Sequence, residues 1–202
     1  MKKLILLLAL PVVFSGFTFI HKAGLTEAER KFAVDHLNQT RTDLINAVQG
    51  LSEAQLNFKQ APDRWSVLEC VQHITLASQG LVSYLQNTLK TPNDSNFKAS
   101  FADEQFIKMI EDRSHKVQTS ENLKPVHSPY KTLEETLTAF NTGRDSLITY
   151  VKTTNDDLRD HIAVMPFGKA DGYQLVLMIS AHTNRHMQQL NEVKADPNFP
   201  KQ

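Results

Sequence analysis

Apolar residues recur at helical spacing along most of this chain. Beyond Gly24, long stretches repeat with a period of about 3.6 residues, and no stretch alternates apolar and polar residues before a hairpin turn. The sequence therefore predicts an all-α fold with no sheet. The four long helices are expected at 26–50, 66–91, 132–154 and 171–194.

Local signals mark where these helices begin. In a capping box, a Ser or Thr N-cap and an acidic residue three positions later each accept a hydrogen bond from the other's backbone N–H. Such boxes open the first three helices: Thr26 with Glu29, Ser66 with Glu69, and Thr132 with Glu135. Asp171 can cap the fourth helix, which Pro197 stops.

Four amphipathic helices of about 20 residues bury their apolar stripes most simply against one another, as a four-helix bundle. A segment of about 40 residues connects the second helix to the third, long enough to cross the length of the bundle. These two helices can therefore run parallel, in an up-down-down-up order. Within the connection, 102–117 is expected to form one additional short helix, and the whole bundle domain is expected to span 26–195.

Composition excludes several classes of protein. The 202 residues carry 22 Lys and Arg against 22 Asp and Glu, so no long-range field gathers phosphates, and no nucleic-acid partner is expected. Cys70 is the only cysteine, which excludes a disulfide framework or a Cys-rich metal site within one chain. Any metal must therefore be held by His and carboxylates.

The N-terminus has the pattern of a signal peptide. Lys2 and Lys3 precede an uncharged apolar run from Leu4 to Phe14, so residues 1–20 are interpreted as a signal peptide or an N-terminal anchor. Cleavage near Gly16 would leave no membrane span and 22 acidic against 20 basic residues, with no basic surplus for anionic lipid. The chain is expected to be exported, to the periplasm or the outside of the cell, and to stay membrane-anchored if the segment is retained.

Candidate chemistry lies on the last helix. At about 100° per residue, His182 and His186 fall within about 60° of Leu175, in the stripe that faces the core. Two imidazoles four residues apart can converge on one metal ion, although a hydrogen-bonded structural pair is the alternative. His73 lies at the edge of the inward stripe of the second helix, from which it can reach the same site. Three His with an open fourth position would polarise a bound water or thiolate.

The segment RWSVLECVQHI at 64–74 resembles the W-S-[IV]-x-E-x-[LIV]-x-H-[LI] signature of the DinB superfamily, and AHTNRHMQQ at 181–189 is similar to its H-x-x-x-H-x-x-Q motif. The resemblance spans 26–194. It implies a four-helix bundle that binds one divalent metal ion, commonly nickel or zinc, through three His. Carried over by position, the ligands are His73, His182 and His186.

The resemblance does not supply a reaction, and three classes of function compete. The first is a metal-dependent hydrolase acting on an unknown small molecule. The second is a thiol-dependent S-transferase, which an oxidising compartment disfavours because reduced thiol is scarce there. The third is a non-catalytic bundle that binds a partner or takes part in a stress response. A homodimer is possible through exposed apolar helix faces.

Three residues near the predicted ligands have both a functional and a structural interpretation. Glu69 is a candidate to support His73 without binding the metal itself, but its place in a capping box already explains why a Glu is found there. Cys70 is a candidate soft ligand or a buried small hydrophobe. Arg185 is a candidate contact for an anionic substrate or a solvated helix flank. The other five His, at 21, 36, 115, 127 and 161, are expected at the surface.

Overall fold

The computed structural model describes residues 24–201, and it confirms the predicted bundle. The predicted signal segment, 1–20, lies outside the described residues. The long helices are α1 (Glu27–Val48), α3 (Val67–Thr88), α5 (Leu133–Thr153) and α6 (Gly172–Lys194). Shorter elements are α2 (Glu53–Asn57), α4 (Asp103–Glu111), the 3-10 turns η1 (Glu121–Leu123) and η2 (Pro125–His127), and strands β1 (Ile162–Met165) and β2 (Gly168–Asp171).

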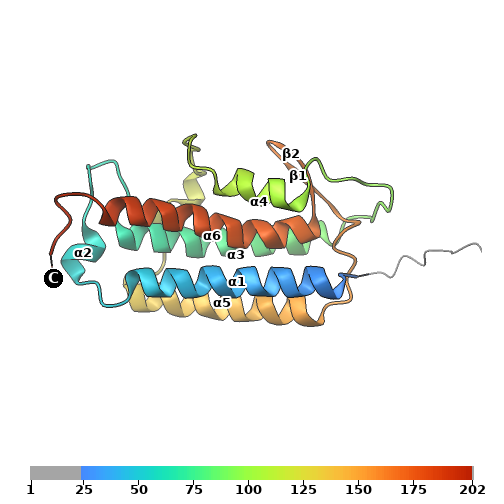
Figure 1. The fold of residues 1–202 in the computed structure, drawn as a ribbon, viewed down its shortest axis with the longest axis horizontal. Coiled ribbons are helices and arrows are strands. Elements are labelled where there is room, and N and C mark those ends of the chain that lie inside the picture. Colours follow the sequence, from blue (N-terminus) through green and yellow to red (C-terminus); the bar gives the residue numbers. More distant parts are fainter. Residues whose placement is uncertain (1–23, 202) are drawn as a thin grey trace, which may run out of the picture.

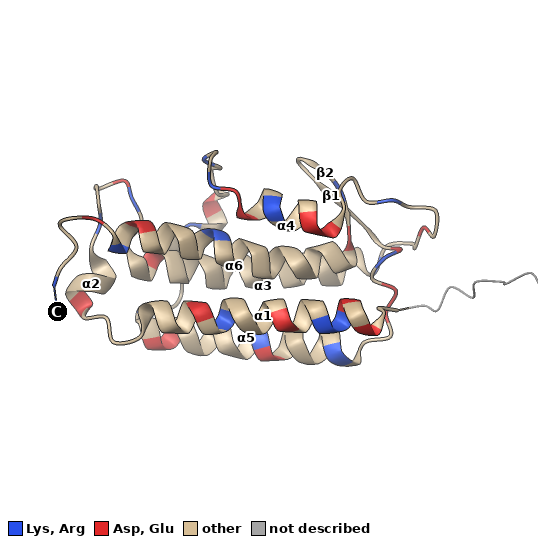
Figure 2. Cartoon of the chain, in the orientation of Figure 1, with Lys and Arg blue, Asp and Glu red and all other residues tan. Residues whose placement is uncertain are grey.

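The four long helices form two layers, with α3 and α6 in one layer and α1 and α5 in the other (Figure 1). Both α3 and α5 run opposite to α1 and α6, which is the up-down-down-up order expected from the long connection. Each long helix packs against one parallel and one antiparallel neighbour, and α4 lies on the outer side of α6. Acidic and basic residues are interspersed along α1 and α5 (Figure 2).

The predicted caps of the long helices are present. Thr26, Ser66 and Thr132 each accept a hydrogen bond from the backbone N–H of the Glu three residues later, and that Glu reaches back to the cap. The Asp171 side chain accepts from the backbone N–H of Gln174 at the start of α6. These contacts satisfy donors that the first helical turn leaves without partners.

The prediction of no sheet was wrong. Strands β1 and β2 form an antiparallel hairpin in which Ile162 pairs with Asp171 and Met165 with Gly168. Gly168 has φ +143°, and a Cβ there would lie 3.0 Å from Ser100 Oγ, which is the group that binds the Lys169 backbone N–H. At four residues each, the strands are too short to show an alternating pattern.

Two smaller elements also differ from expectation. The five-residue helix α2 was not predicted, although Ser52 and Gln55 form a capping box there. The additional helix ends at Glu111 rather than near residue 117. It ends there because Asp112 leaves the helical region, with ψ 118°, and the carbonyls that follow bind Arg185 on α6.

The core consists of two apolar clusters with a polar layer between them. One cluster surrounds Leu37, Leu147 and Ile179, and the other surrounds Leu44 and Phe140. The polar layer lies between them along the helices and joins Thr40 on α1, Arg144 on α5 and Thr183 on α6 by hydrogen bonds. All three residues are at least nine-tenths buried.

Candidate metal centre

The three predicted histidines converge on one point between α3 and α6. One ring nitrogen from each of His73, His182 and His186 lies within 4.8 Å of the other two. The ring centroids are 4.4 Å apart for His73 and His186, 4.5 Å for His182 and His186, and 5.3 Å for His73 and His182. His73 and His186 are buried, and His182 is partly exposed. The centre therefore has an inner side in the bundle and an outer side that solvent can reach.

Hydrogen bonds orient two of the rings. His73 Nδ1 lies 2.8 Å from the carbonyl oxygen of Leu123 in η1, and His186 Nδ1 lies 2.9 Å from Oε1 of Gln189 on α6. Both partner atoms only accept hydrogen bonds, so each Nδ1 carries a proton and donates it. In a neutral imidazole the opposite nitrogen, Nε2, then has a free lone pair, which is the form that binds a metal.

The third ring completes the arrangement. His182 Nε2 lies 3.2 Å from His186 Nε2. Since the His186 nitrogen carries a lone pair, His182 Nε2 either donates a proton to it or shares a cation with it. A divalent ion held by His182 and His186 would take the place of that proton.

Burial keeps all three rings neutral at physiological pH. Loss of hydration lowers the pKa of His182 to about 3, and the nearby His73 and Arg185 lower it further in the same direction. Burial likewise lowers the pKa of His186 well below its ordinary value and that of His73 below its own. The Nε2 atoms of His73 and His186 therefore need to lose no proton at neutral pH before a metal can bind.

A second layer of side chains supports the rings. Gln189 Oε1 also lies 3.4 Å from Nη1 of Arg113, which forms a two-point ion pair with Glu192 at 2.9 and 2.8 Å. The Trp65 ring lies 4.7 Å from the His73 ring and 6.0 Å from the His186 ring. Sequence reasoning did not single out Leu123, Gln189 or Arg113. Only Gln189 had a sequence signal, as the last residue of the quoted motif at 181–189.

Two neighbours of His73 have structural roles. Glu69 completes the capping box with Ser66, and its other oxygen accepts from Lys59 Nζ at 2.7 Å. Cys70 is fully buried, and loss of hydration raises the pKa of its thiol to about 12. A thiol with this pKa is protonated at neutral pH, so Cys70 packs as a small hydrophobe.

Arg185 makes contacts that neither of its two interpretations predicted. Its guanidinium donates to the backbone carbonyls of Ile110, Asp112 and His115. It therefore holds the end of α4 and the chain that follows against α6, with its side chain half-buried. This contact fixes the path of the segment that carries Arg113 toward the centre.

The remaining described histidines lie outside the centre. His115 and His127 are exposed, as predicted. His36 and His161 are half-buried, against the prediction of a surface position. His36 Nδ1 forms a hydrogen bond of 2.8 Å with Ser180 Oγ, which accounts for its burial.

Comparisons with known proteins agree with this arrangement. A family model described as "DinB superfamily" matches residues 36–190, a range that includes all three histidines. The chain is also similar to the "Uncharacterized protein YuaE" of Bacillus subtilis (strain 168). The two are 23% identical over 158 residues, which cover 78% of this chain and 94% of that protein. No solved structure matches the chain significantly.

Proposed function

This chain belongs to the DinB superfamily, and we propose that it is a metal-dependent hydrolase. In this proposal His73, His182 and His186 hold one divalent ion, zinc or nickel, and the substrate is a small molecule. The observation that supports it most is the convergence of three imidazole nitrogens within 4.8 Å, two of them on rings that are already oriented.

The donor set fits such an ion. Imidazole nitrogens suit both zinc and nickel, and a set of three leaves a coordination position open. The second layer also fits, because ligating histidines in metal sites usually donate their other N–H to a carbonyl or carboxylate. Here the Leu123 carbonyl and the Gln189 side chain accept those hydrogens.

The ion would supply a Lewis acid that polarises an oxygen of a water or a substrate. The surrounding residues have separate tasks. The Leu123 carbonyl and Gln189 keep the rings in place, Arg113 keeps the Gln189 oxygen turned toward His186, and Trp65 covers the rings from the side of His73. Hydrolysis is favoured over thiol transfer because export would place the protein in an oxidising compartment, where reduced low-molecular-weight thiols are scarce.

The proposal includes a location and an oligomeric state. Residues 1–20 would direct export, and exposed helix faces would allow a homodimer. No helix in the described part of the chain is long and apolar enough to span a bilayer. Intact mass of protein from native envelope and soluble fractions tests export, since full-length protein in the cytosol contradicts it. Light scattering at high concentration tests the dimer.

Metal analysis of untagged protein, purified without chelator, tests the centre directly. We expect about one zinc or nickel ion per wild-type chain and less than a tenth of that in His186→Ala. The matched control, His127→Ala, removes an exposed histidine and should keep the wild-type content. Gln189→Leu removes the oxygen that holds His186 and should weaken metal binding about 10- to 100-fold. Equal metal content in His186→Ala and wild type would contradict the assignment.

Turnover separates the classes of reaction. Hydrolysis of chromogenic ester and amide substrates should rise and fall with metal content across the same variants. If the loaded protein instead consumes an electrophile only when a low-molecular-weight thiol is added, it is a transferase. If it does neither, the centre is not hydrolytic.

A further inference from the structure

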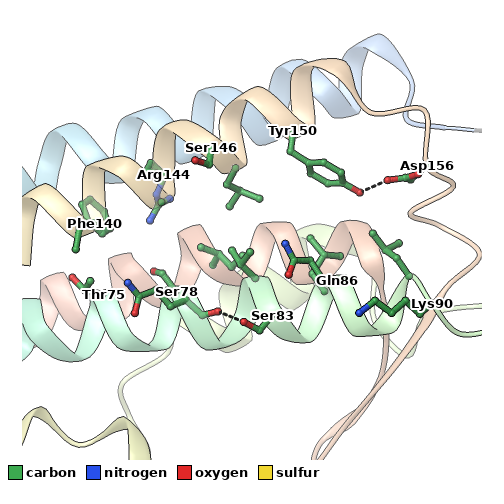
Figure 3. Close-up of a pocket in the computed structure, with 18 residues that line it drawn as sticks. Thr75, Ser78, Ser83, Gln86, Lys90, Phe140, Arg144, Ser146, Tyr150 and Asp156 are labelled. Atoms are coloured by element: carbon green, nitrogen blue, oxygen red, sulfur yellow. Dashed lines mark hydrogen bonds between the residues drawn. The ribbon is translucent and has the colours of Figure 1, made fainter. Parts of the chain in front are cut away.

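A cleft with a volume of about 740 Å³ lies between the parallel helices α3 and α5 (Figure 3). Its α3 side starts at Thr75 and continues to the end of the helix at Thr88, about 20 Å at 1.5 Å per residue, with Leu89 and Lys90 just beyond. Pockets of about 300–1,000 Å³ are the size that bind small molecules and cofactors. The cleft is therefore large enough for a ligand of this kind.

The cleft and the metal centre use different faces of α3. Thr75 lines the cleft and follows His73 by two residues, which is about 200° around the helix. The imidazole of His73 instead faces α6 and η1. A ligand in the cleft would thus occupy a second site, separate from the three histidines.

The most unusual residue of the cleft is Arg144, which projects from α5 toward α3 (Figure 3). It is 2% exposed. Its guanidinium donates to the hydroxyls of Thr183 at 2.9 Å and Thr40 at 3.4 Å and lies 4.9 Å from the Phe140 ring. No Asp or Glu of the described chain forms an ion pair with it, and the charge of another cation, Arg41, acts against its own.

Such an environment disfavours the charge. Burial lowers the pKa of Arg144 to about 9, so the group is still a cation at neutral pH. A buried cation without an anion destabilises a fold, and proteins usually supply a carboxylate partner. Of the five N–H donors of the guanidinium, two are used by threonine hydroxyls, which leaves others available to a ligand.

The rest of the cleft indicates what kind of anion would fit. From Arg144 the walls continue with Val82, Leu85 and Leu147, all apolar. At the far end, about 9 Å of helix further along α5, Tyr150 and Asp156 form a hydrogen bond at 2.8 Å. The cleft thus offers one buried cation, then an apolar passage, then a polar mouth that also carries Lys90.

We propose that this cleft binds a monoanionic amphiphile, a carboxylate with an unbranched apolar tail of medium length. The carboxylate would pair with Arg144, whose planar fork matches two carboxylate oxygens, and the tail would lie along the apolar walls. A single guanidinium balances a single charge, so a carboxylate fits better than a phosphate dianion. The hydroxyl of Ser78, on the α3 side facing Arg144, is available beside the head group, whereas that of Thr75 already donates to the Val71 carbonyl at 2.9 Å.

Calorimetry with three probes of equal tail length tests the proposal: decanoate, 1-decanol and decyltrimethylammonium. Wild-type protein should bind one decanoate per chain, at least about tenfold more tightly than either other probe. Arg144→Met should weaken decanoate binding about 10- to 100-fold and leave decanol binding unchanged. Lys152→Met removes a cation from the exposed side of the same helix and should change nothing.

Two further variants keep the result interpretable. His186→Ala should bind decanoate as wild type does, since the carboxylate is expected on Arg144 and not on a metal ion. Gly143→Leu adds a side chain at the rim of the cleft, where a Cβ meets no atom within 4 Å, and should reduce decanoate binding while Arg144 stays in place. This variant serves if Arg144→Met does not fold.

The outcomes are exclusive. Arg144→Met that melts at or above the wild-type temperature and loses decanoate selectivity supports the proposal. Equal binding of the three probes, unchanged decanoate binding by Arg144→Met, or loss of decanoate binding in His186→Ala overturns it. Absence of decanoate binding by the folded wild-type protein also overturns it.

Discussion

Two arginines, one at an end of the bundle and one in its middle, show how differently one residue type can be used. Arg159 lies where three helices begin, and it pairs with three carboxylates: Glu29, Asp103 and Asp171. Arg144 lies in the middle of the bundle and, within the described chain, pairs with no carboxylate. The pKa of Arg159 is raised above its ordinary value by its partners, against the effect of burial, whereas burial lowers that of Arg144 to about 9.

The arrangement around Arg159 stabilises the fold. Asp171 is the N-cap of α6, Asp103 is the first residue of α4, and Glu29 is in the first turn of α1. Carboxylates at helix N-termini interact well with the helix dipole, and Arg159 joins three of them. The Tyr173 ring lies 4.1 Å below the guanidinium.

The comparison indicates which arginine is structural. The charge of Arg159 is compensated by carboxylates of the protein itself, so this guanidinium needs no anion from outside. The charge on Arg144 lacks this compensation. A protein tolerates such a buried, unpaired cation where a ligand supplies the missing anion. Substitutions at the two sites should therefore change stability in opposite directions.

The largest effect is expected for Arg159→Met. It leaves three carboxylates close together without their cation, and we expect a loss of about 3 kcal/mol in the free energy of unfolding. For a domain of this size the melting temperature would fall by about 6–12 °C. Arg41→Met, which breaks a surface pair with Asp145, should cost less than about 1 kcal/mol. Similar losses in both variants would contradict the structural role of Arg159.

Lowering the pH should reveal the same difference between Arg159 and Arg144 in the free energy of unfolding, with a smaller effect. Burial raises the pKa of Glu29 and Asp103, but hydrogen bonds, including those from Arg159, outweigh it and leave both pKa values lowered. Their stabilisation is therefore present above the pKa of the unfolded chain, about 4, and is lost as the pH falls through the lower folded values. Asp171, whose pKa burial raises, acts in the opposite direction and reduces the drop.

Denaturant unfolding between pH 6 and pH 2.5 measures this effect. Wild type should lose more stability than Arg159→Met over that range, because the variant has already lost the interactions that lower the two pKa values. Arg144→Met should follow the wild-type curve. A steeper curve for Arg159→Met than for wild type would show that other carboxylates dominate acid unfolding.

The smallest effect is expected beside Arg144. Gly143 is inside α5, where a Cβ would meet no atom within 4 Å, so Gly143→Ala should stabilise the protein by about 0.5–1 kcal/mol. The control is Gly50→Ala, which should destabilise because Gly50 has φ +75°. Thermal melts of the two variants should therefore shift in opposite directions. A gain at Gly143 would show that α5 is not optimised for stability along the cleft.

The sequence predicted what depends on local spacing. The capping boxes at Thr26, Ser66 and Thr132 fix three helix starts because both partners lie within one turn. The meeting of His182 with His186 follows from their i, i+4 spacing on an inward face. The approach of His73 followed from its place at the edge of the inward stripe and from the resemblance to a family motif. That the three bind a metal remains a prediction.

Other features depend on contacts between distant segments. The hairpin pairs strands of four residues, and α4 ends where it does because of Arg185, 73 residues away along the chain. Arg144 did leave a signal, since it lies four residues after Phe140 and four before Ile148, within the apolar stripe of α5. A charged residue in that position marks either a buried ion pair or a ligand site, and only the structure shows that no carboxylate of the described chain faces it.

The hydrogen bond from His73 to the backbone of Leu123 has an evolutionary consequence. A carbonyl oxygen is the same for every amino acid, so the residue at 123 is free to vary among relatives while the imidazole keeps its orientation. The length of the segment between Arg113 and Leu123 is not free in this way, because an inserted or deleted residue would move the carbonyl away from the ring. Relatives that conserve the three histidines should therefore vary in the composition of this crossover more readily than in its length.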